Sequence, residues 1–224
     1  MGMYLRLIHS LGALLQRMGN RLCYYKRASA VWIDVGAHLG ETTFGFARNN
    51  PALTVYAFEP NLKLATQRIG RLPNYFIIPM AVAENDGCAD FYINANDAAS
   101  SILPFDKEGL RRWIGVAELR IESKIVVPTI RLETFMTIIG IAKVDYLKID
   151  AQGADFAVIK SAGNRIRDIN KIKLEAQVTP VQLYSGAGTK DEIIKYLEEA
   201  GFVFSLSEKQ TKGQEENLTF VRVK

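Results

Sequence analysis

The sequence has little of what disulfide-framework or membrane-spanning proteins depend on. It contains only two cysteines, Cys23 and Cys88, which lie far apart and show no metal-type spacing. Disulfide frameworks and zinc sites need more cysteines than this, so we expect a reducing compartment and no zinc. No apolar run approaches the ~18 to 20 residues of a membrane span, because charged or turn residues interrupt every candidate. These absences predict a soluble, cytoplasmic protein.

Internal repeats and low-complexity tracts are also absent from the 224 residues. With 48% apolar and 23% charged residues, the composition excludes disordered and collagen-like classes and is typical of a globular protein. The length fits one ordinary domain and leaves no room for a second large one.

Acidic residues are missing from the first 30 positions, which carry five basic residues. Of the 28 basic residues, 23 therefore remain to face 24 acidic ones, so the rest of the chain is electrically balanced. A nucleic-acid-binding domain would need a basic stripe across its fold. The balanced charge of the rest of the chain does not indicate such a stripe, so we expect no nucleic-acid partner. The basic residues of the first segment are Arg6, Arg17, Arg21, Lys26 and Arg27.

The same segment repeats apolar residues every three or four positions, which predicts an amphipathic helix over residues 4–26. We treat residues 1–30 as a separate N-terminal element and residues 31–224 as the domain. The helix could pack on the domain or mediate self-association, or it could anchor the protein peripherally to a membrane. Residues 28–30 resemble a signal-peptide cleavage site, but the four cations before them are wrong for one.

From Val31 onward, short β-rich runs alternate with helical segments. This alternation predicts an α/β fold with a mostly parallel sheet and helices on both faces. The last two strands are joined by about eleven residues too polar for a crossover helix, so they should pair antiparallel. We expect strands at 31–35, 53–58, 75–78, 89–93, 124–127, 144–149, 172–176, 202–206 and 218–223. One helix should follow the first strand and end near residue 48, and further helices should span 61–70, 107–119, 132–139, 154–161 and 190–200.

A glycine turn follows the first strand, in the order Asp34-Val35-Gly36-Ala37-His38-Leu39-Gly40. It is no dinucleotide fingerprint, because His38 and Glu41 stand where that pattern needs glycines. Asp34 and Glu41 would repel a pyrophosphate but suit a cationic ligand such as the ammonium and sulfonium of S-adenosylmethionine. A simple tight turn between strand and helix is the alternative.

Glu59 ends the second strand, 19 residues after Gly40. In α/β folds a carboxylate at this distance accepts hydrogen bonds from a ribose diol. Alternatively, Glu59 caps the following helix, although Asn61 could fill that role itself. Together the turn and Glu59 indicate a nucleoside site.

Two later strands deliver further acids to the same edge of the predicted sheet. Asp150 ends a strand that contains Lys148, and Glu175 lies near the end of the next one. Carboxylates at strand ends in a cleft are typical of functional sites. The structural alternative is a buried ion pair between Lys148 and Glu175, with Asp155 in the first turn of a helix.

Over residues 31–223 the chain resembles the FkbM family of S-adenosylmethionine-dependent methyltransferases. The resemblance implies the class I methyltransferase (Rossmann-like) fold, a seven-stranded sheet with an antiparallel last strand, and O-methylation of a hydroxyl on a sugar or secondary metabolite. It rests on the D-V-G-A-x-x-G turn, F-E-P at 58–60, the pair Ser100-Ser101, V-P-T-I-R-L-E-T-F at 127–135, L-K-I-D-A-Q-G-A-D at 147–155 and N-L-T-F-V-R at 217–222.

The resemblance also implies roles for individual residues. It sets four residues of the turn around the methionine part of the cofactor, Glu59 on its ribose, two residues after the third strand against its adenine, and Asp150 beside the methyl group. The expected cofactor-binding residues, with four further candidates, are Asp34, Gly36, Ala37, His38, Gly40, Glu41, Glu59, Asn61, Ala81, Val82, Ser101 and Asp150.

The chain departs from the family pattern at several positions. Relatives usually carry glutamate in place of Gln152 and of Asp155, often histidine in place of Gln177, and asparagine in place of His38. These changes leave the expected fold and cofactor intact. They bear on the acid–base or metal role at the position of Gln177.

Methyl transfer to a hydroxyl requires a base or a metal, because the hydroxyl proton must leave. We expect Asp150 to be the base, with Glu175 as orienter or second carboxylate and His38 as the remaining candidate. We expect no metal, since Gln177 is a poor ligand for a hard cation.

Two rival functions remain open from the sequence. The chain could be a cofactor-binding module that has lost catalysis, or an N-methyltransferase acting on protein or nucleic acid. The second lacks its usual N/D-P-P-Y/F motif at residues 150–153. Residues 94–124 interrupt the alternation, and their Arg111-Arg112-Trp113 could belong to a lid over the acceptor or to an exposed amphipathic helix.

Overall fold

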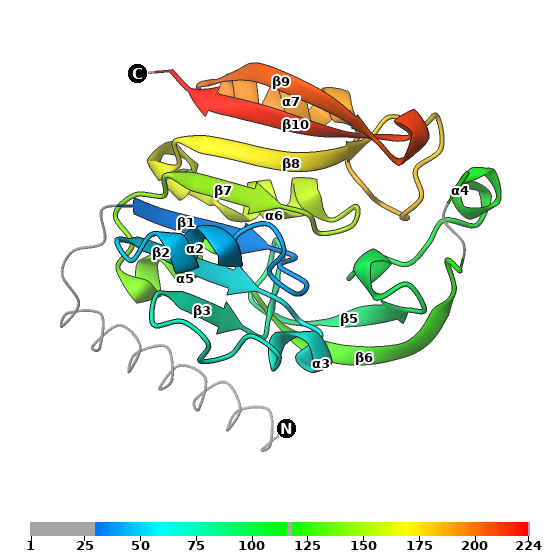
Figure 1. Cartoon of the computed structure of the whole chain (residues 1–224). Coiled ribbons are helices and arrows are strands. Elements are labelled where there is room, and N and C mark those ends of the chain that lie inside the picture. The colour runs from blue at the N-terminus through cyan, green and yellow to red at the C-terminus, as the bar shows by residue number, and fades with distance from the viewer. Residues whose placement is uncertain (1–29, 116–117, 224) are drawn as a thin grey trace.

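A seven-stranded sheet forms the centre of the protein. The computed structural model describes residues 30–115 and 118–223, so the predicted helix at 4–26 and Cys23 lie outside the described residues. The strand order is β3-β2-β1-β7-β8-β10-β9 (Figure 1). Its strands are β1 (Ala30–Val35), β2 (Leu53–Phe58), β3 (Tyr75–Ile78), β7 (Tyr146–Ile149), β8 (Lys171–Gln177), β9 (Phe202–Gln210) and β10 (Glu215–Arg222).

The direction of the strands follows from how they are connected. The first five strands of the sheet pair in parallel, since helices or long segments return the chain between them. β10 pairs antiparallel with β9 because only a short 3₁₀ turn (Thr211–Gly213) separates the two strands. It also pairs antiparallel with β8. The expected α/β sheet with an antiparallel last strand is confirmed.

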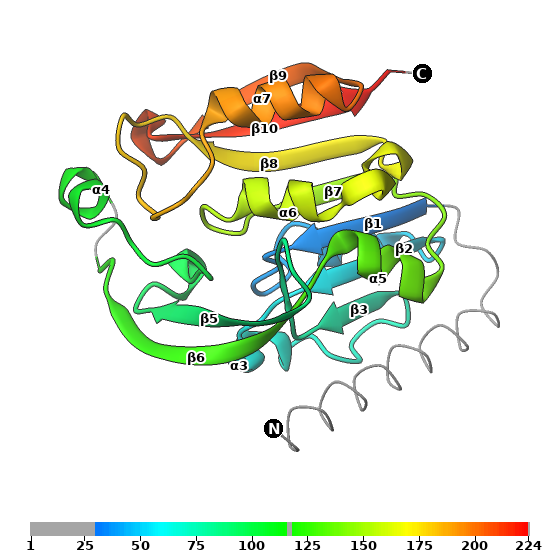
Figure 2. The same ribbon diagram turned by 180° about the vertical axis from the view of Figure 1, so that it is seen from behind.

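Helices cover the two faces unequally. One face carries α5 (Leu132–Ile139), α6 (Asp155–Ser161) and α7 (Lys190–Glu199), as Figure 2 shows. The main core lies between these helices and the sheet and includes Ile33, Leu147 and Leu174, all fully buried. The opposite face carries α2 (Phe44–Asn49) over β2, and α3 (Leu62–Ala65) follows β2.

A second sheet lies beside the carboxyl ends of β1, β2 and β3 (Figure 1). It has the order β4-β6-β5 and consists of β4 (Ala81–Val82), β5 (Gly87–Asn94) and β6 (Ile121–Ile130). The segment between β5 and β6 contains a 3₁₀ turn (Asp97–Ala99) and α4 (Lys107–Arg112). The sequence predicted strands at 89–93 and 124–127 but not this separate sheet, because the pairing of β5 with β6 joins residues far apart in the chain.

Several helices are shorter than predicted. α2 ends at Asn49, close to the predicted end near 48, and it begins at Phe44 after turns with positive φ angles at His38 and Gly40. α3 ends at Ala65 and α4 at Arg112, where Trp113 is already extended. The helix at 132–139 is found with the predicted bounds.

In the described part of the chain, no helix combines the length and hydrophobicity that crossing a bilayer requires.

Candidate active site

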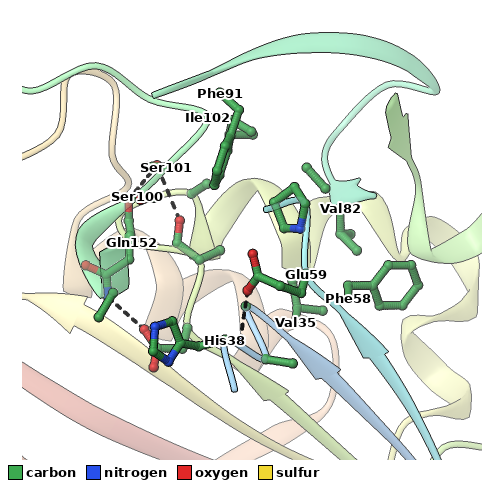
Figure 3. A pocket seen from close by; sticks show the side chains of 18 of the residues that line it. Val35, His38, Phe58, Glu59, Val82, Phe91, Ser100, Ser101, Ile102 and Gln152 are labelled. Atoms are coloured by element: carbon green, nitrogen blue, oxygen red, sulfur yellow. Dashed lines mark hydrogen bonds between the residues drawn. The ribbon is translucent and has the colours of Figure 1, made fainter. Parts of the chain in front are cut away.

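A cavity of about 360 Å³ opens at the carboxyl ends of β1, β2 and β7, with the second sheet closing its far side (Figure 3). This is the edge where open α/β sheets bind ligands. The structure brings nine of the predicted site residues to its lining and leaves Asp34, Gly40, Asn61 and Glu175 outside it. The nine are Gly36, Ala37, His38, Glu41, Glu59, Ala81, Val82, Ser101 and Asp150.

The glycine turn allows β1 and β7 to approach closely. Gly36 has φ +70°, and a Cβ on it would lie 1.8 Å from the carbonyl oxygen of Asp150. The amides of Gly36 and Ala37 donate to the carbonyl oxygen of Phe58 at 3.1 and 3.0 Å. The turn therefore ties the ends of β1, β2 and β7 together and leaves backbone at the floor of the cavity.

Asp34 lies beneath this floor and does not line the cavity. It is fully buried, accepts a hydrogen bond from the Thr43 hydroxyl at 2.5 Å, and lies 3.1 Å from Lys148 Nζ. The expected contact between Asp34 and a cofactor is thus replaced by a contact with Lys148, which also donates to the Gly36 carbonyl at 2.9 Å. Lys148 pairs with Asp34 and Asp150, and the structure gives no ion pair between Lys148 and Glu175.

The charge on Lys148 is well supported. Burial lowers its pKa, but the carboxylates of Asp34 and Asp150 outweigh burial and raise the pKa above the ordinary value for lysine. A buried ammonium thus links the glycine turn to the end of β7.

Glu59 lies at the cavity with its carboxylate fixed on both sides. One oxygen accepts from the amide of His38 and the other from the amide of Asn61, both at 2.8 Å; the first contact is dashed in Figure 3. Burial raises the pKa of Glu59, and the two backbone hydrogen bonds oppose that rise. Asn61 caps α3 through the amide of Lys63, so the capping role falls to Asn61.

The wall beside Glu59 is apolar. Phe58, Val82, Phe91 and Ile102 surround the space next to its carboxylate in Figure 3. Phe91 comes from β5 and Ile102 from the segment after it, and no local sequence signal marked either residue. An apolar slot beside a hydrogen-bonding carboxylate suits the base and ribose of a nucleoside.

His38 connects the turn to the segment after β5. Its Nδ1 lies 2.8 Å from a Glu41 oxygen and its Nε2 3.0 Å from an Asp97 oxygen. Burial lowers the pKa of His38, but the hydrogen bonds to Asp97 and Glu41 outweigh burial and raise the pKa. Both ring nitrogens therefore face a carboxylate oxygen, which favours the imidazolium more than in a free histidine.

Asp150 reaches the cavity from the end of β7, with 42% of its side chain exposed. Its Oδ1 accepts from Gln152 Nε2 at 2.7 Å, and its Oδ2 lies 3.6 Å from Lys148 Nζ. Glu175 lies outside the cavity and is 3.4 Å from the same Gln152 nitrogen. Burial, with the charge of Asp150 next, raises the pKa of Glu175 to about 9.

The remaining polar residues behind Asp150 hold backbone in place. Asp155, in the first turn of α6, accepts from the amides of Ala151 and Glu175, and burial raises its pKa to about 7. Gln177 accepts from the amide of Leu183 at 2.7 Å and so fixes the loop after β8. In residues 30–115 and 118–223, no three His, Cys, Asp or Glu side chains converge as metal ligands would.

Two further residues complete the site. The Ser101 hydroxyl donates to the Gln152 carbonyl at 2.8 Å, and the Tyr184 hydroxyl lies 2.9 Å from Gln152 Oε1. Tyr184 stands in a loop that gave no sequence signal. Arg111 and Arg112 do not line the cavity; they are exposed and pair with Glu108, as the exposed-helix alternative predicts.

Comparison with known proteins identifies the family. Residues 34–204 match the family model of the methyltransferase FkbM domain. The 2-O-methyltransferase NoeI of Sinorhizobium fredii is 23% identical over 172 residues, which cover 72% of this chain and 68% of NoeI.

Similar solved structures include proteins with bound S-adenosyl-L-methionine or S-adenosyl-homocysteine. Fibrillarin of Aeropyrum pernix with bound S-adenosyl-L-methionine has a TM-score of 0.47 and 13% identity, covering 88% of this chain and 67% of that chain. TrmK of M. capricolum with S-adenosyl-homocysteine has a TM-score of 0.43 and 10% identity, covering 92% and 68%.

The family model spans most of the described fold and includes the glycine turn, Glu59 and Asp150. The cavity's carboxylate, its apolar wall and its close-packed glycine turn fit a nucleoside cofactor. The chain belongs to the FkbM family of methyltransferases, and its cofactor is S-adenosylmethionine.

Proposed function

We propose that this methyltransferase acts on a hydroxyl group of a sugar or secondary metabolite, with Asp150 as the base. The observation that carries the proposal is the place of Asp150: a carboxylate that lines the cavity and remains 42% exposed. The 2-O-methyltransferase activity in the name of NoeI supports the same class of acceptor.

The cofactor site follows from the lining. Glu59 would accept hydrogen bonds from the ribose hydroxyls with the lone pairs that its two backbone contacts leave free. Val82 and Phe91 would pack on the adenine, and Glu41 with Asp97 would provide negative charge toward the ammonium group. When bound, S-adenosylmethionine supplies an electrophilic methyl group and leaves as a neutral thioether.

Asp150 has the environment that a base needs. As the acceptor oxygen bonds to the methyl carbon, its O–H proton passes to an oxygen of Asp150. Lys148 Nζ, 3.6 Å from Oδ2, places a positive charge beside the carboxylate that accepts the proton. The acceptor and Asp150 must be aligned within the cavity for the proton to pass as the new bond forms.

The other two candidates are less suited to accept the proton. His38 is held between Glu41 and Asp97, which raise its pKa and favour the form that already carries two ring protons. Glu175 lies outside the cavity, and its raised pKa of about 9 favours the protonated acid at neutral pH. Both residues are better placed to support Asp150 and the cofactor loop.

The experiment is a screen of hydroxylated sugars and metabolites with the purified chain and S-adenosylmethionine, read by product mass. We expect an increase of one methyl group on an oxygen. Ligand at about 100 times its dissociation constant should add ~2.7 kcal/mol of stability, and NAD at the same concentration should add none. Stabilisation by NAD alone, or methylation of nitrogen only, would contradict the proposal.

A further inference from the structure

Gln152 lies between two carboxylates at the edge of the cavity. Its Nε2 is 2.7 Å from Asp150 Oδ1 and 3.4 Å from Glu175 Oε2. An amide nitrogen carries two donor hydrogens at every pH, so this one group faces both acids as a donor. A carboxyl group in its place could donate only while protonated.

The Tyr184 hydroxyl contacts this amide from the other side. Gln152 Oε1 lies 2.9 Å from the hydroxyl of Tyr184, which is almost completely buried. The same hydroxyl lies 2.9 Å from the Ala99 carbonyl, and its single proton can serve either acceptor. Reversing the amide would turn its oxygen toward the Asp150 carboxylate 2.7 Å away, where two acceptor oxygens would face each other.

The backbone of Gln152 is held in a conformation that a non-glycine residue seldom adopts. Its φ is +52°, and its carbonyl accepts from the Ser101 hydroxyl at 2.8 Å. The next residue, Gly153, has φ +86°, and a Cβ there would lie 2.7 Å from the Tyr184 side chain. Such strain persists only where the surroundings over-determine it, and it clusters at functional sites.

Asp150 has mostly acidic residues among its titratable neighbours, so donors to its carboxylate are few. Lys148 on β7 is the nearby cation. Asp155 on α6, Glu175 on β8 and Glu215 on β10 face Asp150 as carboxyl groups, and the charge of Asp150 adds to burial in raising the pKa of each. The Gln152 amide adds a neutral donor where a second cation is missing.

We propose that Gln152 is a positioning residue, whose amide contacts Tyr184 on one side, donates to the Asp150 carboxylate on the other and aims that carboxylate at the acceptor. This deepens the proposed function and rests on it, since Asp150 is the group that is positioned. Tyr184 belongs to the loop after β8, which pairs with the segment after β5 through Phe105. The second sheet is thereby connected to the base.

The test compares three variants in the full chain. Gln152→Glu replaces the permanent donor by an acid. Gln152→Asn shortens the amide by one methylene and suits the positive φ, because asparagine is enriched in that conformation. Gln67→Glu is the matched control, since it makes the same chemical change on an exposed side chain of the turn after α3.

The first readout needs no acceptor. The carboxyl carbon of Asp150, assigned with Asp150→Asn, is titrated by NMR in protein labelled at aspartate. We expect its titration midpoint to rise by about one pH unit in Gln152→Glu and Gln152→Asn, since the charged form loses a donor. Gln67→Glu should leave it unchanged. An unchanged midpoint in both Gln152 variants overturns the inference.

The second readout uses an acceptor from the screen. The acidic limb of the kcat profile should move to higher pH by the same amount in Gln152→Glu, while the KM for S-adenosylmethionine stays within about threefold. A purely structural role would lower the melting temperature without moving this limb. If the NMR midpoint of Asp150 moves but the acidic limb of the kcat profile does not, Gln152 is confirmed as a donor to Asp150. The proposed role of Asp150 as the base is then wrong.

Discussion

The two sides of the cavity are built in different ways. On the nucleoside side, Glu59 contacts the backbone of His38 and Asn61, which lie on the same or the preceding strand-to-helix connection. On the methyl-transfer side, Asp150, Gln152, Glu175 and Tyr184 come from three separate segments and meet only through side chains. The first side is a backbone cradle, and the second is a side-chain network.

This difference predicts different responses to mutation. A backbone cradle should fail when atoms are added to it, since the approach of the strands leaves no space. A side-chain network should fail chemically, through the loss of a donor or a charge, while the fold persists. The following experiments test that contrast.

The largest effect should come from Gly36→Ala. The added Cβ would lie 1.8 Å from the Asp150 carbonyl oxygen, so β1 and β7 would have to separate. We expect a loss of at least ~3 kcal/mol in the free energy of unfolding and loss of cofactor binding. Chemical denaturation measures the free energy of unfolding, and calorimetric titration with S-adenosylhomocysteine measures binding.

The matched control is Gly70→Ala. Gly70 has nearly the same φ, +71°, but no atom lies within 4 Å of its Cβ position. Gly70→Ala should lower the free energy of unfolding by only ~1 kcal/mol, because alanine disfavours a positive φ. Equal losses in the two variants would mean that conformation, and not close approach, sets the requirement at Gly36.

Glu59→Gln and Asp150→Asn should separate binding from chemistry. Glu59→Gln places an NH₂ group against a backbone amide and should weaken cofactor affinity by ~10- to 100-fold. Asp150→Asn should leave that affinity within about threefold and slow transfer by ~100-fold or more. Near-normal turnover of Asp150→Asn at saturating cofactor would remove Asp150 from the role of base.

Glu175→Gln should stabilise the protein in a pH-dependent way. The pKa of Glu175 rises to about 9 in the folded state, so folding loses stability as the pH rises from about 4.5 toward 9. The neutral variant avoids this loss and should gain at least ~1 kcal/mol at pH 8.5, with little difference at pH 4.5. Thermal unfolding of both proteins at the two pH values measures this gain. An equal difference in stability at pH 4.5 and pH 8.5 would contradict a buried, protonated Glu175.

The smallest effect should come from His38→Gln. The pKa of His38 is raised in the folded state, so its contribution is fully present below about 6.5 and disappears as the pH rises through the folded pKa. Because the ring is partly exposed, we expect under ~1 kcal/mol at pH 5.5 and less at pH 9. A loss that grows with pH would show that the ring acts as a neutral group between Glu41 and Asp97.

The sequence predicted the main sheet because its signals are local. Periodicity of two or 3.6 residues and the turn residues are properties of neighbours in the chain, and the helix at 132–139 needed no other information. The second sheet escaped prediction, since β5 and β6 are recognisable as one unit only when they pair. The helices predicted at 61–70 and 107–119 were overestimated, since they end at Ala65 and Arg112.

The candidate site divides in the same way. By itself, the sequence determined that the turn at Gly36, the acid at Glu59 and the acid at Asp150 each end a strand, and parallel strands bring such ends to one edge. The tertiary structure decided which of Asp34, Asp150 and Glu175 lines the cavity. Asp34 is buried beneath the cavity and pairs with Lys148, Glu175 lies behind Gln152, and Asp150 lines the cavity. Sequence spacing does not specify these outcomes, because burial and pairing depend on neighbours from other parts of the chain.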